Sequence, residues 1–124
     1  MSNKEKNLNN IFNQIKEYFS PKIIGEVNDV YIKLALVKGN DIPWHSHDNE
    51  DEMFLVMNGS MVMEIEGQAS FKLSQGEYFI VNKGVNHRIY SEEECRLMLI
   101  EPKKTKHTGD VESKISKDID KQYL

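Results

Sequence analysis

The chain has 124 residues, a formal net charge of -4 and a single cysteine. A chain of this length is expected to form one domain, which leaves no room for a second catalytic domain. The acidic balance argues against nucleic acid as a partner, because phosphate binding needs a basic face. One cysteine excludes an intramolecular disulfide. The absence of an apolar signal segment or a membrane-length apolar run predicts a soluble, cytoplasmic protein without a membrane partner.

The first 21 residues are expected to form a helical segment. Their apolar side chains recur at helical spacing, and Ser20-Pro21 then provides a stop signal. We expect this helix to pack on the outside of the domain through one apolar stripe, which consists of Leu8, Ile11, Phe12, Ile15 and Phe19.

Two strands are predicted next, over residues 22–26 and 30–38, with the turn pair Asn28-Asp29 between them. In the second strand the even-numbered and odd-numbered side chains form two largely apolar faces. Either face could look inward.

A cluster of potential metal ligands follows. His45 and His47 are two residues apart, so on an extended backbone both point to one face and form a chelating pair. Glu52 opens an apolar strand and can return beside them, whereas the acidic residues in 48–51 fit a connecting loop. His87 would complete the set. Imidazole and carboxylate together suit one divalent transition metal, such as Fe, Mn, Ni or Zn, with coordination positions left for a substrate.

The run from Met53 to Met57 is apolar at every position, so both of its faces need cover. The following Asn58-Gly59 is a strong signal for a type I′ hairpin, which would pair Met57 with Ser60 and continue toward residue 65. With Glu52 directed to the metal, alternation assigns the inward residues as Phe54, Val56, Met61, Met63 and Ile65. It assigns the outward residues as Met53, Leu55, Met57 and Val62.

Further strands are expected at residues 71–73, 77–81, 87–91 and 95–101, and His87 and Ile89 share a face of the third. Cys95 lies among apolar neighbours and is interpreted as a buried structural residue. The methionines are interpreted as packing residues, since a histidine and glutamate site prefers harder ions. Residues 102–124 form a polar tail in which Val111, Ile115, Ile119 and Tyr123 recur every four residues. This tail is expected to be either a weakly amphipathic helix or disordered, and His107 within it is expected to be solvated.

The spacing of these residues resembles the two motifs of the cupin family. The first motif matches without a gap, as Gly39, His45, His47, Glu52 and Gly59. The second matches as Gly76, Asn82, Gly84, His87 and Ser91, although the family usually has Pro at the position of Asn82 and Asn at that of Ser91. The resemblance implies an all-β double-stranded β-helix, or jelly-roll barrel, over residues 22–101. It also implies that His45, His47, Glu52 and His87 surround one ion.

The ligand set and the resemblance favour a metal-dependent small-molecule enzyme, either a dioxygenase that uses Fe(II) or an isomerase that uses Lewis acidity. The sequence offers no general base, so the catalytic residues are unknown. The alternative is a non-catalytic small-ligand binding or sensor protein. Some similar small cupins are described by likeness to mannose-6-phosphate isomerase, but only two arginines are present and the expected lining is apolar, which argues against a phosphosugar. That lining is Phe54, Val56, Met61, Met63, Ile65 and Ile89.

A homodimer is also expected. The outward residues Met53, Leu55, Met57 and Val62 would form an apolar patch larger than monomers usually expose. The N-terminal helix could cover one side of this patch, and a second copy of the chain could cover the other.

Overall fold

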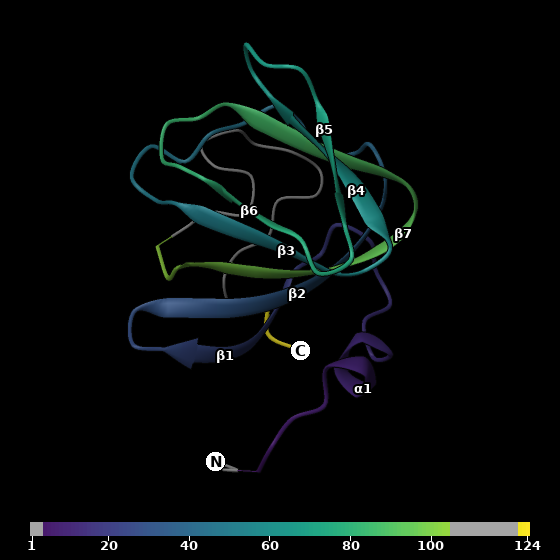
Figure 1. The fold of residues 1–124 in the computed structure, drawn as a ribbon. Coiled ribbons are helices and arrows are strands. Elements are labelled where there is room, and N and C mark those ends of the chain that lie inside the picture. The colour runs from purple at the N-terminus through teal and green to yellow at the C-terminus, as the bar shows by residue number, and fades with distance from the viewer. Residues whose placement is uncertain (1–3, 105–121) are drawn as a thin grey trace.

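The computed structural model describes residues 4–104 and 122–124 and contains one short helix and seven strands (Figure 1). The mainly antiparallel β fold agrees with the predicted jelly-roll barrel. In chain order the elements are α1 (Leu8–Phe12), β1 (Lys22–Val27), β2 (Val30–Gly39), β3 (Glu52–Asn58), β4 (Ser60–Ile65), β5 (Phe71–Ser74), β6 (Tyr78–Val81) and β7 (His87–Pro102).

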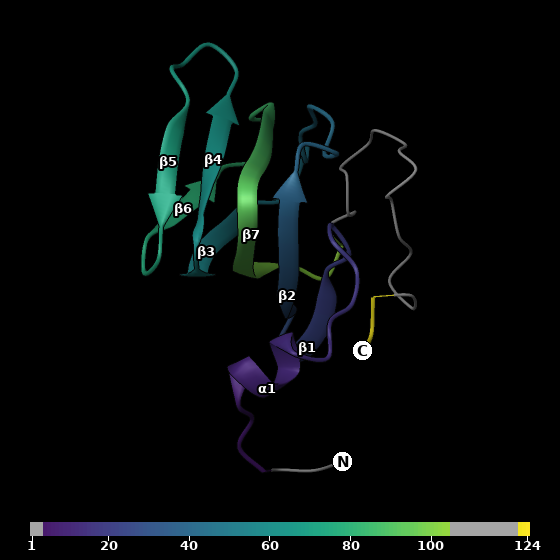
Figure 2. The ribbon, with the colours of Figure 1, turned by 90° about the vertical axis from the view of Figure 1, so that its right-hand side faces the viewer.

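Strand β7 holds the two halves of the fold together. Its first residues pair with β4, and its part beyond Cys95 pairs with both β2 and β3. The resulting strand order is β1-β2-β7-β3-β6, and β5 is attached through β4. Figure 2 shows β4 and β5 beside the upper part of β7 and β2. Strand β7 therefore passes from one sheet to the other. We conclude that one long strand joins the two sheets of the barrel.

The face of β2 that the sequence left undecided is settled by its packing. Ala35 and Val37 belong to the barrel core, together with residues from β3, β4 and β7. Leu34 and Leu36 point outward into a second cluster, where they pack against Phe12 and Ile15. The odd-numbered face of β2 therefore looks inward, and the even-numbered face meets the N-terminal segment.

The N-terminal helix is shorter than predicted. It ends at Phe12 rather than Phe19, and Tyr18 instead forms a bridge with Leu36, while the Phe19 amide donates a hydrogen bond to the Leu36 carbonyl at 2.8 Å. Strand β1 begins opposite Leu34, which leaves this edge of β2 open for that bridge. Pairing with an open strand edge thus replaces the last two turns of the expected helix.

The hairpin predicted at Asn58-Gly59 is wrong. Strand β3 pairs with β6 and β7, and β4 pairs with β5 and β7, so β3 and β4 do not pair with each other. Of Asn58 and Gly59, only Gly59 has a positive φ, of 84°, whereas a type I′ turn needs a positive φ at both central residues. Both edges of β3 are already occupied. The chain therefore turns at Gly59 to change sheets, and passes so close to β7 that a Cβ atom there would lie 2.8 Å from the Glu94 carbonyl oxygen.

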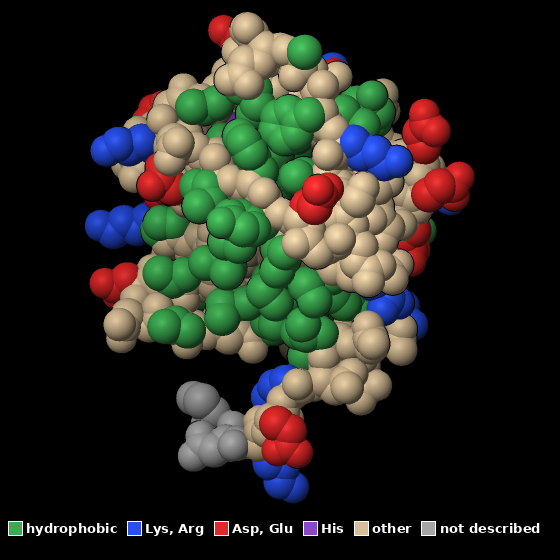
Figure 3. Space-filling view, in the orientation of Figure 1, with side chains coloured by type: hydrophobic (Ala, Val, Ile, Leu, Met, Phe, Trp, Pro, Cys, Tyr) green, Lys and Arg blue, Asp and Glu red, His purple; other side chains and the backbone are tan. Residues whose placement is uncertain are grey.

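Two rows of apolar side chains cross the outer face of the sheet formed by β2, β7, β3 and β6. The strand registers align Ile32, Ile100, Met53 and Ile80 in one row and Leu34, Met98, Leu55 and Tyr78 in the next. Tyr78 is 60% exposed and Ile80 is 45% exposed. Figure 3 shows this surface as a continuous hydrophobic area. Neither row contains a charged residue.

This surface differs from the patch predicted from the sequence. Val62 belongs to β4 and lies beside Tyr90 and Lys72, not beside Leu55. The N-terminal segment covers only part of the area, because its cluster includes Leu34 and Met98 but not Ile80 or Tyr78. The apolar surface that the N-terminal segment leaves uncovered therefore extends farther over β3 and β6 than the sequence predicted.

The predictions for His107 and for the apolar repeat between Val111 and Ile119 fall outside the described residues. Within residues 4–104 and 122–124, no helix is long and apolar enough to cross a membrane.

We propose that a second copy of the chain covers this outer sheet face in a two-fold dimer. An uncharged apolar face is complementary to itself, and burial of each large apolar side chain contributes roughly 1.5–3 kcal/mol against association entropy. Leu55→Asp places a charge near the centre of the two rows and is expected to convert dimer to monomer in light scattering coupled to gel filtration. Val62→Asp, on the other sheet, is the matched control and should leave the mass unchanged. A wild-type mass of one chain at micromolar concentration would refute the dimer.

Candidate metal centre

The three histidines and Glu52 are brought together by the pairing of two distant chain segments. The backbone amides and carbonyls of His45 and His87 exchange hydrogen bonds of 3.0 and 2.9 Å. The His47 carbonyl accepts a hydrogen bond from the Gly84 amide at 2.8 Å, and the Asp51 carboxylate accepts one from the Lys83 amide at 2.8 Å. The loop after β2 is therefore fixed to the segment before β7. Asp51 serves in this attachment, and Glu52, the first residue of β3, faces the histidines.

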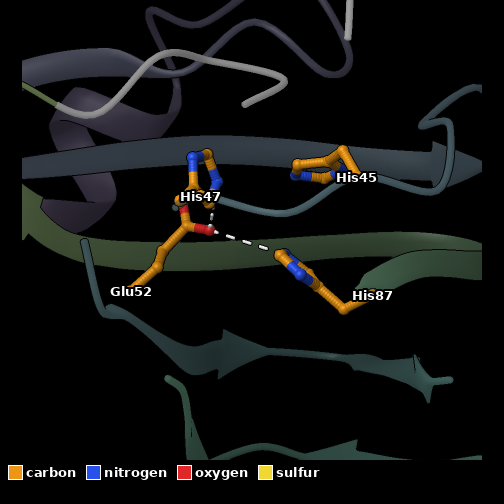
Figure 4. Close-up of side chains that lie close together, drawn as sticks. All are labelled: His45, His47, Glu52 and His87. Atoms are coloured by element: carbon orange, nitrogen blue, oxygen red, sulfur yellow. Dashed lines mark ion pairs between the residues drawn. The ribbon is translucent and has the colours of Figure 1, made fainter. Parts of the chain in front are cut away.

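The four predicted ligand residues converge on a small volume. One nitrogen or oxygen atom from each of His45, His47, Glu52 and His87 lies within 4.8 Å of the corresponding atoms of the others. The Glu52 Oε1 atom lies 3.3 Å from His47 Nε2 and 3.7 Å from His87 Nε2, and Figure 4 shows this carboxylate between the two rings. All four residues are buried, with at most 6% of each exposed.

Backbone carbonyl groups fix the orientation of two imidazole rings. His45 Nδ1 lies 2.9 Å from the Pro43 carbonyl oxygen, and His87 Nδ1 lies 2.9 Å from the Val85 carbonyl oxygen. A neutral ring that donates from Nδ1 presents the lone pair of Nε2, which is the arrangement found in metal-binding histidines. Both rings are thus prepared to coordinate through Nε2.

Several polar atoms of the cluster are buried without a hydrogen-bond partner in the described part of the chain. They are both ring nitrogens of His47, Nε2 of His87 and Oε1 of Glu52. The contacts between Glu52 and the two rings are short enough for ion pairs but lack hydrogen-bond geometry. Leaving such groups unpaired is costly, and a divalent cation bound among them would satisfy three of these atoms at once. The donor set therefore fits a transition metal ion.

The electrostatics of the cluster keep the ligands in their coordinating forms. Burial, and then the proximity of His87, lower the pKa of His45 from 6.5 to about 4, so this ring is neutral near pH 7. Burial opposes ionisation of Glu52, but the contacts with His47 and His87 hold the pKa of Glu52 well below its usual range. The site therefore presents a neutral imidazole and a carboxylate without competition from protons.

The cluster opens into a cavity inside the barrel. Its empty volume is about 520 Å³ when the space at its open mouth is included, which is an upper limit on what a ligand can fill. The cavity is lined by His45, Glu52 and His87 from the cluster, and mainly by apolar residues elsewhere. These apolar residues are Phe19, Pro21, Ala35, Val37, Ile42, Phe54, Ile89, Leu97 and Leu99.

The cavity lining differs from the one predicted. Phe54 and Ile89 do line the cavity, but the other four predicted residues are packed in the core cluster behind it. Those four are Val56, Met61, Met63 and Ile65. They come from the part of β3 beyond Phe54 and from β4. All four face the interior as predicted, since they are buried in the barrel core, but they do not line the cavity.

A buried group of polar residues at the cavity was missed by sequence reasoning. Lys33 Nζ lies 2.7 Å from Glu101 Oε1 and donates a hydrogen bond of 2.5 Å to Gln122 Oε1. All three residues are at most 3% exposed, and Lys33 and Glu101 line the cavity. Each charged residue lies on an otherwise apolar strand face, Lys33 before Ala35 and Val37, and Glu101 after Leu97 and Leu99. A charged residue on an apolar strand face could have indicated a buried polar group. For Lys33, however, this required knowing that the odd-numbered face of β2 looks inward.

Glu101 connects this group to the metal cluster. The pairing of β3 with β7, in which Met53 lies opposite Ile100, places Glu101 next to Glu52 on the neighbouring strand, and both residues line the cavity. Burial and the negative charge of Glu52 raise the pKa of Glu101 well above its usual range, although Lys33 acts in the opposite sense. One ammonium group therefore lies close to two neighbouring carboxyl groups.

Comparison with known proteins agrees with the fold. A family model described as the cupin domain matches residues 33–101. The protein YdbB of Bacillus subtilis is 33% identical over 88 residues, which cover 71% of this chain and 77% of YdbB. The match leaves out part of each chain.

Two solved structures are similar in both sequence and fold. A cupin-2 domain protein from Shewanella frigidimarina is 38% identical, with a TM-score of 0.75 over 78% of this chain and 93% of that one. The protein NMB1881 from Neisseria meningitidis is 32% identical, with a TM-score of 0.72 over 80% of this chain and 99% of that one.

The lowered pKa of His45 predicts that the metal-free protein loses stability at acidic pH. The unfolded chain binds a proton at this residue below about pH 6.5, whereas the folded chain does so only near pH 4. The free energy of unfolding should therefore fall as the pH drops through this window, by roughly 3 kcal/mol at about 1.4 kcal/mol per pH unit. The lowered pKa of Glu52 removes further stability below that window.

Urea denaturation of metal-free protein between pH 4 and pH 7.5 would measure this loss. The His45→Gln variant should show a flatter dependence between pH 4.5 and 6.5, because its side chain does not titrate. Equal slopes in the two proteins would contradict the assignment of this window to His45.

Proposed function

Because this chain belongs to the cupin family, we propose that it binds one divalent transition metal and uses it to act on a small molecule. The observation that carries this proposal is the convergence of buried donor atoms of His47, Glu52 and His87 that lack hydrogen-bond partners in the described residues, beside a cavity. Three imidazoles and one carboxylate are harder donors than the thiolates of structural zinc sites, which favours a site with open positions.

An enzyme of the oxygenase or isomerase type fits this site best. A bound metal of this kind would supply Lewis acidity or, where it is redox-active, oxygen activation. The chain's own residues would position the substrate against it: the apolar walls exclude water, and Phe54 borders the ring of His87 at a centroid distance of 6.0 Å. Lys33 and Glu101 add ionisable groups at the cavity wall, which the sequence had not revealed.

The cavity favours a small, largely apolar substrate with an oxygen group that can reach the metal. A phosphosugar is disfavoured, because neither arginine lines the cavity. Arg88 stacks on Trp44 at 4.9 Å and pairs with Glu64, and Arg96 lies 5.1 Å from the Phe12 ring. Lys33 is engaged by Glu101 and Gln122.

A non-catalytic small-ligand or sensor protein is the second candidate function. The same metal and cavity would then hold a ligand without converting it.

The metal proposal predicts about one divalent ion per chain in protein purified without a metal-affinity tag. His47→Ala and His87→Ala should each lower the metal content below one tenth of an equivalent, since a buried ligand is lost, while circular dichroism shows a folded barrel. Elemental analysis by inductively coupled plasma mass spectrometry provides the measurement. Asp48→Asn is the matched control in the same loop, and should keep the full metal content. Stoichiometric metal in both histidine variants would rule out this ligand set.

Turnover distinguishes the two candidate functions. Protein reconstituted with Fe(II), Mn(II), Ni(II) or Zn(II) would be incubated with small keto, hydroxy and aromatic compounds, with and without oxygen, and the products analysed by mass spectrometry. We expect conversion of at least one compound class that depends on His87. Saturable binding without conversion in any metal form would instead support the sensor function, and tight binding of a sugar phosphate would refute the substrate inference.

A further inference from the structure

The C-terminal residues of the chain return to the barrel and reach its interior. The Gln122 carbonyl accepts a hydrogen bond from the Ile23 amide at 2.7 Å, and Tyr123 forms a bridge with Ile23. The C-terminal end accordingly lies beside β1 in both ribbon views (Figures 1 and 2). The Gln122 side chain is 1% exposed and accepts the hydrogen bond from Lys33. These residues are therefore part of the packed structure at this end of the cavity.

A continuous set of buried contacts runs from Gln122 to the metal cluster. Gln122 holds the ammonium group of Lys33, Lys33 holds Glu101, and Glu101 lies next to Glu52 on the neighbouring strand. Glu52 in turn lies between His47 and His87. Each member comes from a different element: the C-terminal residues, β2, β7 and β3.

The composition of this set indicates a role beyond stability. Burying an ion pair removes two charges from water, and replacing such a pair with apolar residues is often neutral or stabilising. The barrel core around Lys33 is otherwise apolar, so leucine or methionine would have filled the same space. Groups that orient a metal ligand, by contrast, must be polar and held in place.

We propose that Lys33, Glu101 and Gln122 form a positioning relay, which fixes the carboxylate of Glu52 from the C-terminal end of the chain. This inference rests on the proposed metal site and concerns how that site is held. The relay residues do not coordinate the metal. They restrict the rotation of Glu52, so that one of its oxygen atoms stays directed at the histidines.

The relay predicts that metal affinity and protein stability can be separated. The double variant Lys33→Met/Glu101→Leu removes both charges and keeps an apolar core, so it is expected to fold. It should nevertheless bind Co²⁺ about 10–100-fold more weakly than wild type, the range typical for the loss of groups that orient metal ligands. The visible absorption spectrum of bound Co²⁺ should also shift, because the Glu52 carboxylate no longer has one fixed position.

Gln122→Leu tests the same relay from its far end, with a single neutral substitution. We expect a weaker Co²⁺ affinity and an altered Co²⁺ spectrum in this variant too. Tyr123→Phe is the matched control, since it removes only a partly exposed hydroxyl group that lies 3.5 Å from the Tyr31 hydroxyl. It should retain both the wild-type affinity and the wild-type spectrum.

The experiment is a titration of full-length, metal-free protein with Co²⁺ in competition with a chelator, with thermal unfolding recorded for each variant. If wild type binds one equivalent and the double variant and Gln122→Leu match it in affinity and spectrum, the relay is refuted while the metal site stands. If wild type binds no Co²⁺ or other divalent ion, the proposed function itself fails. Weaker binding and a shifted spectrum in Gln122→Leu, with unchanged thermal stability, would support the relay directly.

Discussion

The candidate site depends on one backbone interaction, the mutual hydrogen bonding of His45 and His87. These residues are 42 positions apart in the sequence, and the two bonds place the loop after β2 against the start of β7. The ring centroids of the two histidines then lie 4.4 Å apart. Because β7 continues from His87 through both sheets, the same strand that presents this histidine also organises the barrel. The geometry of the site is therefore tied to the fold itself rather than to a mobile loop.

Much of the site could be predicted from the sequence, because local spacing carries the necessary information. Two histidines separated by one residue share a face on any extended backbone, and Glu52 begins a strand whose alternation is fixed. The strands β1 and β2 were also recognisable, from the Asn28-Asp29 turn between them. These features depend on residues that are close together in the chain.

The errors arose where the answer depends on partners that are distant in the chain. Asn58-Gly59 has the local signature of a hairpin, but β3 is already paired on both edges, and that fact follows from the position of β7. The helix was predicted to continue to Phe19, but Tyr18 instead pairs with the edge of β2. Lys33 and Glu101 were overlooked as cavity residues, because the inward face of β2 is decided by packing. Local propensity was overridden by tertiary contacts in each case.

The buried polar groups suggest a balance between stability and function. A Lys33–Glu101 pair and four potential metal ligands are enclosed by a mainly apolar core. Breaking a buried pair by removing one partner typically costs about 3–5 kcal/mol, whereas an apolar replacement of both is often harmless. The Lys33–Glu101 pair is thus not needed to stabilise the barrel. Its presence is better explained by the requirements of a site than by those of folding.

X-ray absorption spectroscopy of protein reconstituted with one equivalent of Zn²⁺ tests the central claim most directly, because it reports the ligands of the metal. The account predicts a first shell of nitrogen and oxygen at about 2.0–2.2 Å, with outer-shell scattering from three imidazole rings. A sulfur atom at about 2.3 Å, or scattering from fewer than two imidazoles, would contradict a centre built on His45, His47, Glu52 and His87.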